Sequence, residues 1–80
     1  MKVIVKCFSQ VRYHLGKDEL VFHLEEGVTT SYLEEKVRDQ AGDLLEGVSL
    51  RVAVNQKYTP EAVELKDGDE VALIPPVQGG

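Results

Sequence analysis

The sequence predicts an α+β fold in which a mixed five-stranded sheet is covered on one face by one main helix. Five short stretches of the 80-residue chain have the pattern of strands, and one longer stretch has the spacing of an amphipathic helix. The composition, with 42% hydrophobic and 29% charged residues, is that of a folded globular chain. No repeat, linker or low-complexity segment marks a boundary, so we expect one domain over residues 1–80.

The first two strands are predicted at residues 2–8 and 19–24. In the first, the alternation places Val3, Val5 and Cys7 on one face of the sheet. The second repeats this pattern with leucine and phenylalanine side chains. We expect the apolar face of both strands to meet the helix.

The main helix is predicted between a threonine cap and a glycine stop. Thr29 or Thr30 can accept a hydrogen bond from the first turn, and Gly42 can adopt the backbone conformation that ends a helix. Leu33 and Val37 lie four residues apart and form the apolar stripe. This stripe is expected to pack on the face that carries Val3 and Val5.

The second half of the chain predicts three more strands. They are expected at residues 49–55, at a short segment 62–65, and at 69–74 after a turn at 66–68. The first and last strands are apolar enough to be neighbours in the middle of the sheet. With one helix on one face, this order corresponds to the ubiquitin-like β-grasp arrangement.

Charge and composition exclude several classes of function. Nine basic and fourteen acidic residues give a net charge of −5, and no cluster of lysine and arginine suggests a nucleic-acid partner. No apolar run approaches the roughly 20 residues that span a bilayer, and the N-terminal residues do not have the pattern of a signal peptide. We therefore expect a cytoplasmic protein that binds neither nucleic acid nor membrane. Its acidic surface suits a basic protein partner.

The residues that most often carry chemistry are not arranged for it. Cys7 falls on the inward face of its strand. A buried, small apolar residue is therefore a simpler interpretation of Cys7 than a carrier of a persulfide. His14 and His23 have no zinc-type pattern around them, and the Asp-Gly-Asp-Glu run at 67–70 is typical of a turn rather than a calcium site. The segment around Lys17 lacks the glycine and the hydroxyl residue of a phosphate loop. We expect this chain to bind no metal and no cofactor.

The end of the chain carries a family resemblance. The run "RVAVNQKYTPEAVELKDGDEVALIPPVQGG" is similar to the C-terminal half of the small, sulfur-carrier subunit of molybdopterin synthase. Members of that family share an Ala-Val-Asn segment, a Leu-x-Asp-Gly-Asp-Glu-Val-Ala segment and a Pro-Pro-Val-x-Gly-Gly end, in this order. The N-terminal run "VKCFSQVRYHLG" also looks like the family's first strand and short helix. The specific part of the resemblance lies in residues 52–80.

The resemblance implies a chemical role for the C-terminus. It implies that Gly80 is adenylated by a ubiquitin-activating-type adenylyltransferase, which uses ATP and Mg, and that a sulfur-donor protein converts it to a thiocarboxylate. The chain would then act as a non-catalytic subunit and sulfur-donating co-substrate. Its partner would be the large subunit of molybdopterin synthase, in a heterotetramer that makes the molybdenum or tungsten cofactor.

The residues before Gly80 suit insertion into another protein. We expect residues 75–80 to form a flexible, extended reactive tail. Each proline fixes φ near −65° and keeps the preceding residue extended. A terminal glycine has no Cβ and can pass through a narrow tunnel. The residues assigned to tail insertion are Pro75, Pro76, Val77, Gln78 and Gly79.

Three other functions remain open at this point. The chain could be a ubiquitin-like modifier joined to lysines through Gly80, a sulfur carrier of the thiamine pathway, or an interaction module with an inert tail. Thiamine-pathway carriers usually lack the Pro-Pro before the glycines, which favours the molybdopterin branch.

The side of the sheet away from the helix is a candidate docking surface. Ile4 and Phe8 of the first strand are expected to face this side, where Ala72 and Ile74 of the last strand could join them. Such a patch beside the tail would suit both partners. Ordinary surface apolarity is the alternative interpretation.

Overall fold

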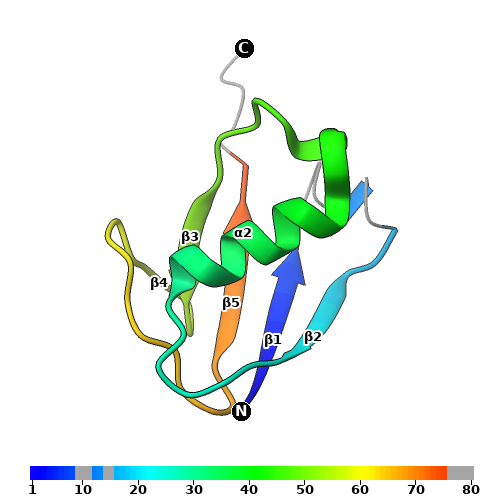
Figure 1. Ribbon diagram of the computed structural model, residues 1–80. Helices are drawn as coiled ribbons and strands as arrows, with labels where there is room; N and C mark the ends of the chain where they lie inside the picture. The colour runs from blue at the N-terminus through cyan, green and yellow to red at the C-terminus, as the bar shows by residue number, and fades with distance from the viewer. Residues whose placement is uncertain (9–11, 14–15, 76–80) are drawn as a thin grey trace.

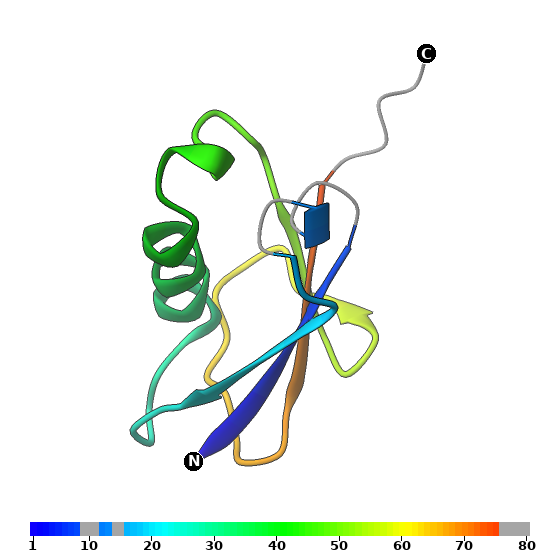
Figure 2. The same cartoon turned by 90° about the vertical axis from the view of Figure 1, so that its right-hand side faces the viewer.

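A computed structural model describes residues 1–8, 12–13 and 16–75 of the chain. The elements in chain order are β1 Lys2–Cys7, β2 Glu19–His23, α2 Thr30–Ala41, the 3-10 helix η1 Gly42–Leu45, β3 Arg51–Val54, β4 Lys57–Tyr58 and β5 Glu70–Ile74. The strands form one sheet in the order β2-β1-β5-β3-β4. Helix α2 crosses one face of this sheet (Figures 1 and 2).

The pairing of the strands confirms the predicted β-grasp arrangement. Strands β1 and β5 are parallel neighbours near the centre of the sheet, and the other pairs are antiparallel. Parallel neighbours need a crossover connection, which here contains α2. The mixed five-stranded sheet under one main helix is therefore as predicted.

The alternation of β1 builds the centre of the core. Val3 and Val5 have no exposed surface, and Cys7 is also buried. They face α2, whose Leu33 and Val37 are likewise fully buried. The predicted contact between the helix stripe and this face of the sheet is confirmed.

The ends of α2 follow from the local sequence. Thr29 is the N-cap, and its hydroxyl oxygen accepts a hydrogen bond from the Tyr32 N–H at 3.4 Å. Gly42 ends the helix with φ of 64°, a conformation that glycine adopts without steric cost. Of the two threonines considered as caps, the structure selects the first.

The predicted strand at 62–65 is wrong. The fourth strand is β4, which pairs with β3 through a two-residue turn at Asn55 and Gln56. Both turn residues have positive φ, 50° and 71°, as a type I′ hairpin turn requires. The sequence signal is weak because glycine, the usual second residue of such a turn, is replaced by glutamine.

Residues 62–65 pair with the first residue of α2 and with the segment before it, instead of joining the sheet. The Thr30 N–H donates to the Val63 carbonyl at 2.9 Å, and the Leu65 N–H donates to the Val28 carbonyl at 2.9 Å. Leu65 is buried in the core. These contacts use the backbone groups that a further sheet strand would need.

Strand β5 leads directly to the C-terminal tail. Its last residue, Ile74, pairs with Arg51 at the start of β3, at the end of the molecule opposite to Met1 (Figure 2). Pro75 follows and is buried. The rest of the predicted tail, residues 76–80, lies outside the described residues.

Candidate functional site

The described end of the chain is held firmly by the sheet. Strand β5 lies between β1 and β3, and its Leu73 has no exposed surface. Ile74 is half-buried, and Pro75, the first residue of the predicted tail, is buried. The chain is therefore still packed against the body of the protein at Pro75, one residue further than predicted. We call Ile74 and Pro75 the tail root.

The predicted reactive residue is not among those that the structure describes. Gly80 and the tail-insertion residues Pro76, Val77, Gln78 and Gly79 all lie outside the described ranges. Their roles stay a prediction. Pro75 is the one tail-insertion residue within these ranges, and it packs against the body of the protein.

The side of the sheet opposite α2, which we call the open face, contains a shallow hollow of about 240 Å³. It brings together three of the residues predicted for a docking surface, namely Phe8, Ala72 and Ile74. Ile4 is half-buried and does not line the hollow. The full lining is Lys6, Phe8, Ala53, Gln56, Tyr58, Glu70, Ala72 and Ile74. Because Ile74 belongs to the tail root, the hollow adjoins the place where the described part of the chain ends.

Tyr58 is a member of this surface that the sequence interpretation missed. The sequence predicts no strand at residues 56–61, whereas the β3–β4 hairpin places Tyr58 opposite Ala53 in the sheet. Its side chain is 64% exposed, and Phe8 is 46% exposed. Two partly exposed aromatic side chains beside a hollow are typical of a protein-binding surface. Recognition of the Asn55-Gln56 turn would have predicted this position.

Charged groups border the open face near β1 and β2. Lys6 forms an ion pair with Glu19, and Arg12 pairs with Asp18 at 2.8 Å. The hydrogen bond to Glu19 raises the pKa of Lys6 above its ordinary value. These exposed pairs contribute little to stability, but they give the rim of the open face both signs of charge.

Cys7 is not arranged to act as a nucleophile or sulfur carrier. Burial raises the pKa of its thiol, and the charge of Asp18 acts in the same direction. The reactive form of cysteine is the thiolate, and here the neutral thiol is favoured. This agrees with the interpretation of Cys7 as a core residue.

The acidic run before β5 is a turn, as predicted. The Asp67 carboxylate accepts a hydrogen bond from the Lys2 N–H at 2.7 Å, and the Asp69 carboxylate accepts one from the Lys66 N–H at 2.8 Å. Gly68 between them has φ of 86°. Both carboxylates are therefore occupied by backbone groups. Within residues 1–8, 12–13 and 16–75, no group of three or more His, Cys, Asp or Glu side chains is placed to hold a metal ion.

No helix in the described part of the chain is both long enough and apolar enough to cross a membrane.

Comparisons with known proteins connect this geometry to a family. The ThiS family model matches residues 5–80. The chain is 38% identical to the molybdopterin synthase sulfur carrier subunit of Haemophilus influenzae, over 95% of this chain and 96% of that protein.

Two solved structures resemble the fold over nearly the whole chain. One is a molybdopterin converting factor subunit 1 of Pyrococcus furiosus, with a TM-score of 0.84, 32% identity, and coverage of 95% of this chain and 98% of that one. The other comes from a complex of subunits 1 and 2 of the molybdopterin-converting factor of Helicobacter pylori. Its TM-score is 0.69, its identity 26%, and its coverage 100% of both chains.

Proposed function

The chain belongs to the ThiS family, and from this premise we propose that it is the sulfur carrier subunit of a molybdopterin synthase. The observation that carries the proposal is the relation, over almost the full length, to a protein of that name. The fixed strand β5 supports it, because this strand runs directly into the Pro-Pro-Val-Gln-Gly-Gly end. The chain is then a co-substrate of the synthase, and the catalytic side chains belong to its large subunit.

The chemistry of the tail begins with activation of the terminal carboxylate. A carboxylate is a poor electrophile because its negative charge repels a nucleophile. Reaction with ATP joins the Gly80 carboxylate to AMP and releases pyrophosphate. Sulfur delivered by a donor at the oxidation level of sulfide then attacks the carbonyl carbon, which exchanges its bond to the AMP oxygen for a bond to sulfur, and AMP leaves. The resulting thiocarboxylate is a much stronger nucleophile than the carboxylate.

This activation is assigned to a partner enzyme. The sequence offers no phosphate loop, so ATP and Mg belong to a ubiquitin-activating-type adenylyltransferase, and the sulfur comes from a donor protein. A fully extended segment of five residues, as from Pro76 to Gly80, spans at most about 17 Å. That length suffices for the tail to enter an active site while the body of the carrier stays outside.

The second partner is the large subunit of the synthase, in a heterotetramer. The related Helicobacter pylori protein in a complex of subunits 1 and 2 supports this assignment. The open face is the proposed docking surface, since its hollow includes Ile74 at the tail root and carries the exposed Phe8 and Tyr58. We assign the protein to the cytoplasm and its product to the molybdenum or tungsten cofactor pathway.

The intact mass of the chain, isolated from cells that make the cofactor, tests this proposal. A fraction of the protein should be heavier by the difference between sulfur and oxygen, and fragmentation should place the change at Gly80. The proposal would be contradicted if the chain kept its unmodified mass both in cells that make the cofactor and in cells that lack the large subunit of the synthase.

Two further measurements separate the alternative functions. Tryptic peptides of many cell proteins in which a lysine carries residues 67–80 of this chain, the segment after its last tryptic site Lys66, would indicate a modifier. A thiocarboxylate that depends on the demand for thiamine, and not on that for molybdopterin, would indicate a thiamine-pathway carrier.

A further inference from the structure

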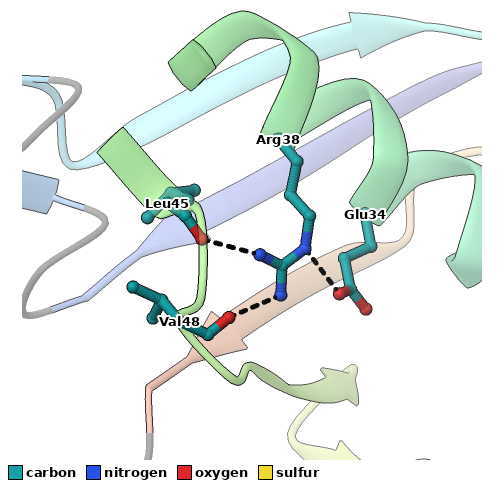
Figure 3. Close-up of polar contacts among 4 residues, drawn as sticks. All are labelled: Glu34, Arg38, Leu45 and Val48. Atoms are coloured by element: carbon teal, nitrogen blue, oxygen red, sulfur yellow. Dashed lines mark hydrogen bonds and ion pairs between the residues drawn. The ribbon is translucent and has the colours of Figure 1, made fainter. Parts of the chain in front are cut away.

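Arg38 makes a set of contacts that neither the core nor the tail chemistry explains. Its guanidinium group donates three hydrogen bonds: to the Glu34 carboxylate at 3.0 Å, to the Leu45 carbonyl at 3.0 Å and to the Val48 carbonyl at 2.8 Å (Figure 3). Glu34 lies one turn earlier on α2, at i,i+4, so it orients the arginine from its own helix. The side chains of Arg38 and Glu34 are 31% and 27% exposed, which places the group partly out of solvent.

The two carbonyls belong to the connection between α2 and β3. Leu45 ends η1, and Val48 lies in the following segment Glu46–Leu50, which has no regular secondary structure beyond a turn. The turn is closed by a hydrogen bond from the Val48 N–H to the Leu45 carbonyl at 3.1 Å, with φ of 77° at Gly47. Arg38 therefore fixes this segment from the helix side. A lysine could not replace it, because one ammonium group lacks the planar fork that reaches separate acceptors.

This segment lies beside the tail root. Leu50 is followed by Arg51, the residue that pairs with Ile74 at the end of β5. Figures 1 and 2 show the connection running down into β3 at the end of the molecule where β5 finishes. Leu44 just before the segment is 50% exposed, and Glu46 and Ser49 within it are exposed. A partner that takes up the tail from its root meets these residues.

We propose that Arg38 is a positioning residue that holds segment Glu46–Leu50 ready as a contact surface for the large subunit of the synthase. This inference rests on the proposed function. The segment forms a second wall at the tail root, on the side of the sheet that carries α2, whereas the hollow described above lies on the open face. Because the segment is ordered before binding, the partner does not have to order it, which favours association.

The test measures the dissociation constant between the full-length chain and the large subunit of the same organism. Arg38→Met removes all three donors and keeps an unbranched side chain. If the segment then holds its binding conformation only about a tenth of the time, the apparent Kd rises about tenfold, since it equals the intrinsic value divided by the competent fraction. Arg38→Lys keeps the positive charge without the fork and should also weaken binding.

Two comparisons separate positioning from charge and from stability. Arg38→Met changes the net charge from −5 to −6, since one positive charge is lost. Attraction to a basic partner would then increase, which is opposite to the expected weakening. Thr30→Val is the matched stability control, because it removes the hydroxyl that accepts a hydrogen bond from the Val63 N–H at 3.1 Å, at the other end of α2. All variants are compared at a temperature at which circular dichroism shows them folded.

Each outcome decides the inference. It is supported if both Arg38 variants weaken binding and Thr30→Val does not. It is overturned if the Arg38 variants bind like the unmodified chain, or if Thr30→Val weakens binding equally. If Arg38→Met does not fold, Arg38→Lys and Glu34→Gln supply the same comparison. Glu34→Gln leaves the two carbonyl contacts of Arg38 intact, so it should weaken binding less than Arg38→Lys. An unmodified chain that does not bind the large subunit would instead overturn the proposed function, and the inference with it.

Discussion

Asn55 both adopts the backbone conformation of a tight turn and forms two side-chain hydrogen bonds to the neighbouring strand segment. Its φ of 50° lies in the left-handed region, which asparagine tolerates better than most residues. Its side-chain oxygen accepts a hydrogen bond from the Glu70 N–H at 3.0 Å, and its amide nitrogen donates to the Asp69 carboxylate at 3.0 Å. The residue thus joins the β3–β4 turn to the start of β5. This gives a physical reason for the Ala-Val-Asn and Asp-Gly-Asp-Glu segments on which the resemblance depends.

At the same scale, Cys7 should be almost inert in the folded protein. Alkylation at neutral pH should be slower in buffer than in denaturant by a factor on the order of 100 or more, because the buried thiol reacts only after local or global opening. Mass spectrometry of quenched samples measures both rates. Equal rates would show that Cys7 is accessible and would reopen a role for it in carrying sulfur.

The raised pKa of Cys7 also fixes the sign of a pH effect. Folding raises the pKa of this thiol, so the unfolded chain loses its proton first as the pH rises. The contribution to stability is complete below the ordinary thiol pKa of about 8.5 and is lost as the pH rises through the higher pKa of the folded state. Chemical denaturation between pH 7 and 10 measures this loss, and Cys7→Ala should show a smaller decline.

At the scale of elements, helix α2 owes its stability to its contact with β1. Leu33 is fully buried on the face that carries Val3 and Val5. Leu33→Ala should therefore lower the free energy of unfolding by about 2–5 kcal/mol, as large-to-small core substitutions do. Urea denaturation measures this loss. A loss below about 1 kcal/mol would mean that the cavity collapses or that the helix face is assigned wrongly.

In the β3–β4 hairpin, one substitution is expected to raise the free energy of unfolding instead of lowering it. Gln56 has φ of 71°, which costs a residue with a side chain roughly 1–2 kcal/mol. Gln56→Gly should relieve this strain at an entropic cost of roughly 0.5–1 kcal/mol, and so stabilise the protein by up to about 1 kcal/mol. Gln56→Ala is the matched control, because it shortens the side chain and keeps the strain. A glycine variant no more stable than the alanine variant would contradict the turn assignment.

The elements also show which parts of the fold the sequence could predict. Burial of side chains on one face of an element leaves a periodic pattern in the sequence. This pattern predicts the buried face of β1, with Val3, Val5 and Cys7, and that of α2, with Leu33 and Val37, and both predictions are confirmed. The short strands were harder, because β4 has only two residues and its turn lacks the usual glycine. Segment 62–65 has the pattern of a strand, but its backbone partners are Val28 and Thr30, at the start of α2 and just before it. Such long-range pairing leaves no local signal in the sequence.

The candidate site divides in a similar way. Phe8, Ala72 and Ile74 were predicted for the open face from the period of their strands. Tyr58 was missed with its strand, and the Arg38 contacts were missed because two of its acceptors are backbone carbonyls seven and ten residues away. Backbone acceptors have no signature in the sequence. The reactive role of Gly80 stays a prediction, which rests on the family resemblance and on the chemistry of its carboxylate.

At the scale of the whole molecule, the acidic surface should govern how fast the partner is found. The net charge of −5 suits a large subunit with a basic channel for the tail. Association should therefore slow as the salt concentration rises, because the Debye length falls from about 10 Å at 0.1 M to about 3 Å at 1 M. Stopped-flow mixing measures the rate. A rate that does not change with salt would exclude electrostatic steering of this complex.

The most direct measurement is the synthesis of molybdopterin with a carrier that lacks Gly80. Removing this residue moves the terminal carboxylate back by about 3.5 Å along an extended chain, whereas reacting atoms must approach within roughly 3–3.5 Å in the correct geometry. The shortened chain should fold with unchanged circular dichroism and thermal stability, because the core ends at Leu73 and Pro75. It should form no thiocarboxylate and support no molybdopterin synthesis with the purified activating enzyme, sulfur donor and large subunit. Synthesis at a near-normal rate by the shortened chain would contradict the assignment of Gly80 as the reactive residue.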